Sequence, residues 1–119
     1  MMLRSEIIFF IDKLIKMTQH GKLSWNKVKP VMRMNSSVEY VDVVYEAYLE
    51  NMIVWIYQKN YKYYYDEIDF SWDKEIVIEL IDPETHLVMQ ELKASNAGEL
   101  LNAINYKSIH SFYSRVLEK

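Results

Sequence analysis

Two stretches of this sequence alternate apolar and polar residues with a period of two, and a short turn and a partner strand follow each. The stretches are residues 38–49 and 74–82, and the turns are Glu50–Asn51 and Asp82–Thr85. A period of two is typical of β-strands, because successive side chains point to opposite faces of a sheet. Strands joined by such short turns run antiparallel. The pattern therefore predicts a sheet built from hairpins.

Helical patterns stand at both ends of the chain. Apolar residues recur at helical spacing before Gly21 at Ile7, Ile8, Ile11, Leu14, Ile15 and Thr18. Gly21 suits the left-handed position after a helix, and a short strand is expected at 23–26. At the other end two apolar stripes, with Ser108 as a cap between them, predict a break near 106–108. We expect an α+β fold in a single domain, residues 1–119, with an N-terminal helix, an antiparallel sheet of about five strands and one or two C-terminal helices.

Composition excludes several kinds of chemistry. The chain has no cysteine, so disulfides and thiolate chemistry are excluded, which fits a reducing cytoplasm. Two glycines cannot build a glycine-rich phosphate loop, and none of the three histidines stands in the context of a catalytic triad. The apolar run 7–11 is too short to span a membrane. We therefore expect a cytoplasmic, non-enzymatic protein without a cofactor.

The strongest candidate for a binding site is the stretch 61–73, which holds six aromatic rings and four carboxylates. Rings at protein interfaces often dominate binding, and the surrounding carboxylates favour a basic partner. The predicted partner-binding residues are Tyr61, Tyr63, Tyr64, Tyr65, Asp66, Glu67, Asp69, Trp72 and Asp73. Alternation places Tyr61, Tyr63 and Tyr65 on one side, and Tyr64 with Asp66 on the other. A homodimer through the strand 38–49, apolar on both faces, is a further expectation.

Two alternatives use other chemistry. A nucleic-acid-binding site would combine one indole with nearby cations, namely Lys22, Trp25, Lys27, Lys29 and Arg33. Against it, residues 66–91 carry a net charge of −8, which repels phosphates, and Trp25 is expected to pack on the first helix. A small hydrolase would hold a metal ion on the carboxylates of the stretch 61–73. Those carboxylates lack the spacing and the glycine of an EF-hand loop.

Several segments together resemble a group of small bacterial proteins, scattered through genomes and mobile elements, to which no function is assigned. The segments are Thr18 with Gly21–Trp25, the tyrosine-rich stretch, the strand Glu75–Asp82 and the helical segment Leu100–Tyr106. The resemblance spans most of the chain. It implies a compact α+β domain with no known active site, and it assigns no functional residue. The expected role is an accessory, immunity or inhibitor protein.

Overall fold

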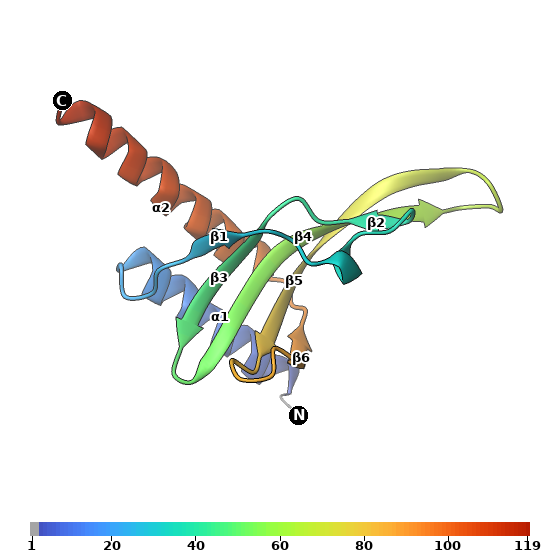
Figure 1. Cartoon of the computed structure of the whole chain (residues 1–119), viewed down its shortest axis with the longest axis horizontal. Helices are drawn as coiled ribbons and strands as arrows, with labels where there is room; N and C mark the ends of the chain where they lie inside the picture. Colours follow the sequence, from blue (N-terminus) through green and yellow to red (C-terminus); the bar gives the residue numbers. More distant parts are fainter. Residues whose placement is uncertain (1–2) are drawn as a thin grey trace. The chain divides into compact units, whose positions relative to one another are not determined.

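Over residues 3–119, the computed structural model holds two α-helices, one short 3₁₀ helix and six β-strands (Figure 1). Along the chain the elements are α1 (Arg4–Gln19), β1 (Asn26–Val28), η1 (Met32–Met34), β2 (Glu39–Tyr40), β3 (Val44–Leu49), β4 (Met52–Tyr64), β5 (Phe70–Ile81), β6 (Val88–Leu92) and α2 (Ala97–Leu117). All strand pairs are antiparallel. The predicted α+β class is confirmed.

The described chain divides into two compact units. Residues 3–25 and 93–119 form the helical unit, and residues 26–92 form the sheet unit. The helical unit carries eight basic and four acidic residues, a net charge of +4, whereas the sheet unit carries six basic and thirteen acidic residues, a net charge of −7. Each unit has buried apolar residues of its own. The single domain stays a prediction.

In the sheet unit, the strands follow the order β1-β3-β4-β5-β6, and β2 pairs separately with β4. The strand predicted over residues 38–49 is interrupted, because the backbone N–H of Val41 donates to the side chain of Asn35, 3.1 Å away, instead of joining a ladder. The predicted strand 23–26 is shifted to β1. In the β3–β4 turn, Glu50 takes a positive φ of 49°.

One face of the sheet unit encloses a core in which η1 covers the strands. Met34 of η1 lies with apolar residues of the loop and strands, namely Val41, Val44, Ile53, Trp55, Tyr57, Val77 and Ile81. The indole Nε1 of Trp55 donates to Glu46 over 2.7 Å, so its polar edge is satisfied inside this apolar cluster. Burial of these side chains supplies the main driving force that fixes the register of the central strands.

In the helical unit, α1 and α2 pack side by side (Figure 1). The predicted face of α1 is buried at Ile11, Leu14, Ile15 and Thr18. Gly21 takes the predicted positive φ of 71°, and the next two backbone N–H groups turn back to the carbonyl of Met17. The helix thus ends in the left-handed turn that its sequence predicts.

Helix α2 is continuous from Ala97 to Leu117, so the predicted break near residues 106–108 is wrong. Ser108 lies in its interior instead of capping a second helix. A serine that precedes apolar residues at helical spacing fits a helix N-cap and a helix interior alike, because serine is tolerated inside helices at modest cost. Asn96, the residue before α2, forms no side-chain capping hydrogen bond with the helix. The Asn96 side chain donates instead to the carbonyl of Ile8, 2.9 Å away, and ties the start of α2 to α1.

The continuity of α2 can be tested at Ser108. Proline there removes one backbone hydrogen bond in the helix interior and clashes with the preceding turn, at a cost of about 3 kcal/mol. We expect Ser108→Pro to lower the helical circular dichroism signal and to expose the amides of residues 108–117 to hydrogen exchange. Ser108→Ala should keep both signals. A proline variant with unchanged helicity would mean that two helices meet at this point.

Candidate protein-interaction surface

The β4–β5 hairpin is longer than its neighbours and continues as a two-stranded arm. The two strands pair over twelve positions, from Ile53↔Ile81 to Tyr64↔Phe70. Strand β3 accompanies β4 only as far as Tyr57, and β6 begins its pairing with β5 at Ile78. Residues 58–76 beyond these limits are called the arm. Among the described strands, β2 alone pairs with its side (Figure 1). The stretch 61–73, with its six rings and four carboxylates, forms the outer part of this arm.

Alternation gives the arm two different faces. Lys62 and Tyr64 of β4 face Trp72 and Phe70 of β5, and Tyr40 of β2 joins them. These five residues are called the aromatic face. Tyr61 and Tyr63 lie on the opposite face, as the alternation predicted, whereas Tyr65 lies in the tip turn and its hydroxyl donates to the carbonyl of Phe70.

The rings of the aromatic face hold one another in place. Trp72 contacts Tyr40 and Phe70 edge to face, with ring centroids 5.3 and 6.0 Å apart, and Tyr64 lies 5.4 Å from Phe70. The ammonium of Lys62 lies 4.4 Å from the centre of the Phe70 ring. These four rings are nevertheless 37–51% exposed. Each ring pair contributes about 0.5–1.5 kcal/mol, so the face is ordered although it is open to water.

The carboxylates of the tip do not converge. The Asp66 carboxylate accepts the backbone N–H groups of Asp69 and Ile68 at 2.7 and 2.9 Å, and these hydrogen bonds hold its pKa below the usual range. Asp66 therefore stabilises the turn. Asp73 lies on the opposite face of the arm, where it accepts the hydroxyl of Tyr61 at 3.4 Å. Among residues 3–119, no three histidine or carboxylate side chains are placed to hold a metal ion.

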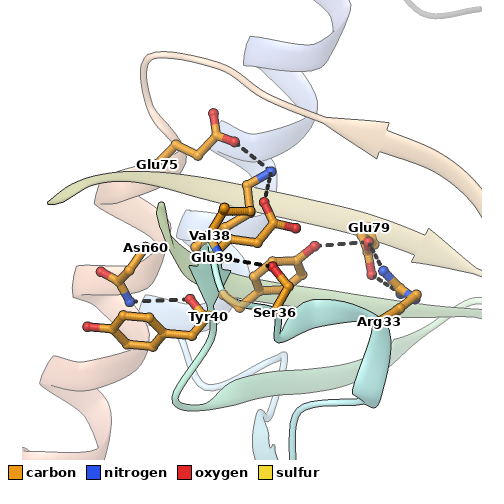
Figure 2. Close-up of polar contacts among 10 residues, drawn as sticks. Arg33, Ser36, Val38, Glu39, Tyr40, Asn60, Glu75 and Glu79 are labelled. Atoms are coloured by element: carbon orange, nitrogen blue, oxygen red, sulfur yellow. Dashed lines mark hydrogen bonds and ion pairs between the residues drawn. The ribbon is translucent and has the colours of Figure 1, made fainter. Parts of the chain in front are cut away.

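On the same face as Tyr61, charges pair along the strands. The ammonium of Lys59 lies 3.0 Å from the carboxylate of Glu75 and 3.9 Å from that of Glu39 (Figure 2). These pairs are partly exposed, and each contributes little to stability. They do neutralise part of the charge on this face, so the excess negative charge of the arm lies mainly toward its tip, at Glu67 and Asp69.

The cations proposed for nucleic-acid binding fall in both units. Lys22 and Trp25 belong to the helical unit, whereas Lys27, Lys29 and Arg33 belong to the sheet unit. Trp25 is half-buried, and its Nε1 donates to the Thr18 hydroxyl of α1 over 3.0 Å, which confirms its expected packing on the first helix. Arg33 is already paired within the sheet unit, which weakens that alternative.

Arg33 pairs with a group that was not predicted from the sequence. Its guanidinium forms two hydrogen bonds, of 2.8 and 3.1 Å, with the buried carboxylate of Glu79 (Figure 2). The hydroxyl of Tyr57 donates to the same carboxylate over 3.0 Å. Burial and the adjacent carboxylate raise the pKa of Tyr57, and Glu79 raises the pKa of Arg33. The sequence hints at this pair only through Glu79, an acidic residue on the same face of its strand as the apolar Val77 and Ile81.

No family model, curated protein or solved structure matches this chain. Neither of the described helices is long and apolar enough to cross a membrane.

The Arg33–Glu79 pair generates a prediction for stability. Arg33→Met leaves the buried carboxylate with the Tyr57 hydroxyl alone, and we expect the free energy of unfolding to fall by about 1–3 kcal/mol, since Arg33 is itself half exposed. The double variant Arg33→Met/Glu79→Gln removes the unpaired charge and should be more stable than the single variant. Urea denaturation measures both, and exposed Lys29→Met is the control. If the double variant is no more stable than the single one, the contact between Arg33 and Glu79 does not act as a charge pair.

Proposed function

We propose that the protein is a non-enzymatic interaction module whose arm binds a basic surface on another protein. The observation that carries this proposal is the aromatic face, four rings that are ordered by one another and left open to water on a projecting hairpin. Such a role fits the expected accessory, immunity or inhibitor protein.

The arm is built in a way that favours a partner. A two-stranded hairpin in water is marginally stable, because it has little apolar surface to bury on its own. The arm places its rings on one face, where a partner could cover them together. Tryptophan and tyrosine contribute most to binding when they are buried at the centre of an interface. Trp72 lies between Tyr40 and Phe70, which supports a central role for it in the proposed interface.

Charge selects the class of partner. The sheet unit that carries the arm has a net charge of −7, and Glu67 and Asp69 are exposed at the tip. Opposite charge on a partner speeds its capture and disfavours acidic competitors. The phosphates of a nucleic acid would be repelled by the same carboxylates. A basic protein surface therefore suits the arm better than DNA or RNA.

We propose a homodimer as a second property, through a different surface from the one that the sequence suggested. Strand β3 is paired on both edges, and Val44, Tyr45 and Ala47 are buried. Exposed apolar residues lie instead on the C-terminal half of α2, namely Tyr106, Ile109, Phe112, Tyr113, Val116 and Leu117. Tyr106, Ile109, Tyr113 and Val116 follow one another at intervals of three, four and three residues, and we call these four the seam. This is the spacing of the contact stripe between paired helices.

The arm can be tested by quantitative capture from a lysate of the source cells. We expect the wild-type chain to capture a basic protein, and Phe70→Thr/Trp72→Thr to lose it, because loss of a central ring weakens binding by about 30-fold or more. Charge reversal by Glu67→Lys/Asp69→Lys should also weaken capture, chiefly through a slower association rate.

Two matched variants are the controls for this experiment. Tyr48→Thr removes an exposed ring outside the arm, and Glu84→Lys reverses an exposed charge in another turn. Both should retain the captured protein. The proposal is wrong if no captured protein depends on the arm residues, or if those that do are acidic.

The proposed homodimer can be tested by comparing the mass of the wild-type protein in solution with that of a variant in the seam of α2. We expect wild-type protein to sediment as a dimer at roughly 100 μM, and Ile109→Glu/Tyr113→Glu as a monomer, because buried unpaired carboxylates oppose association. Tyr48→Thr should remain dimeric. A wild-type monomer at this concentration rejects the homodimer and leaves the arm proposal untouched.

A further inference from the structure

The helical unit contains a pocket of about 390 Å³ that the proposed function does not use. Its walls come from the end of α1, the loop that follows it and one face of α2. The lining residues are Thr18, Gly21, Leu23, Ser24, Trp25, Ile104, Lys107, Ser108, Ser111 and Arg115. The volume falls in the range of small-molecule sites, roughly 300–1,000 Å³.

The continuity of α2 assembles the polar wall of this pocket. Lys107, Ser111 and Arg115 follow one another at intervals of four residues, so they lie on one stripe of an unbroken helix. Ser111 stands between the two cations, one helical turn from each. The exposed apolar seam of α2 lies on the opposite side of the helix, because its residues fall about half a turn away.

The pocket has the electrostatics of an anion site. Two cations and no carboxylate are among its ten lining residues, and the helical unit as a whole is basic, with a net charge of +4. A methyl group added at Gly21 would lie 3.9 Å from the ammonium of Lys107, so this cation reaches the wall opposite its own helix. Within residues 3–119, neither Lys107 nor Arg115 forms an ion pair. Their charge is therefore free for a ligand.

The other wall is flat and partly apolar. The indole of Trp25 is held in place by its hydrogen bond to Thr18, which uses the ring's only donor and leaves its carbon surface to the pocket. Hydroxyl groups come from Ser24, Ser108 and Ser111. Cations and hydroxyl groups together bind phosphate oxygens, whereas an indole stacks on a flat ring.

We infer that this pocket binds a small ligand with both a phosphate group and a flat ring, such as a nucleoside monophosphate. Lys107 and Arg115 hold the phosphate, Ser111 donates to it between them, and Trp25 packs on the ring. The inference does not depend on the arm, since all the lining residues belong to the helical unit.

Titration of the full chain with AMP tests the inference. Calorimetry measures the binding, and ¹H–¹⁵N spectra monitor the indole N–H signals of the three tryptophans. We expect saturable binding that shifts the Trp25 signal and leaves those of Trp55 and Trp72 unchanged. Lys107→Gln and Arg115→Gln should each weaken binding by about tenfold or more, because each removes charge-assisted hydrogen bonds to the phosphate. Lys13→Gln, which removes an exposed cation of α1 outside the pocket, should bind as the wild type does.

Three further probes identify the part of the ligand that is recognised. Adenosine should bind at least about tenfold more weakly than AMP, since it lacks the phosphate, and inorganic phosphate should also bind more weakly, since it lacks the ring. Equal binding of phosphate and AMP rejects the role of Trp25. A ten-nucleotide single-stranded DNA that binds far more tightly than AMP at the same signals assigns the pocket to nucleic acid and overturns the inference. Failure to saturate with AMP at roughly 10 mM, or binding unchanged in both cation variants, also overturns it.

Discussion

The pairing of β4 with β5 is the interaction on which the sheet unit depends. Its twelve consecutive pairs run from the buried core to the tip of the arm. A shift of one residue would exchange the two faces along the whole length. It would move Trp55 and Tyr57 out of the core and, at the same time, disperse the rings around Trp72. The buried half of the hairpin therefore fixes the register of the exposed half, and this register decides which rings meet on the aromatic face.

Much of this fold could be predicted from sequence, because the signals are local. Period-two alternation indicated the strands, and Gly21 marked the end of α1 by its freedom to adopt positive φ. The interior of α2 could not be predicted, since Ser108 suits a cap and a helix interior almost equally. The aromatic stretch was recognised, yet its place at the tip was missed, because the length of a hairpin depends on which neighbouring strands stop early. Arg33 and Glu79 are 46 residues apart, and no local pattern connects them.

The division of charge between the two units affects where a charged partner is attracted. The sheet unit is strongly acidic and the helical unit is basic, so the net charge of −3 describes neither. Within the sheet unit, the deeply buried carboxylate of Glu79 is compensated by Arg33, and Lys59 pairs with two carboxylates. The tip of the arm has no comparable cation beside Glu67 and Asp69 in the described pairs. Negative electrostatic potential is therefore strongest at the tip of the arm, at the end of the hairpin away from the core of the sheet unit.

Exposed rings accumulate where a long element continues beyond its shorter neighbours. On the arm they occupy a strand pair that β3 and β6 no longer accompany, and on α2 they follow Ile104, its last buried residue. Partly exposed rings contribute less burial energy than core residues do, so both segments depend more on local hydrogen bonds and on contacts among their own side chains. Segments of this kind open more readily than the core does. Their side chains can adjust to a partner while the buried strands and the paired starts of the helices keep their structure. Partner binding and the stability of the fold therefore depend on different parts of the chain.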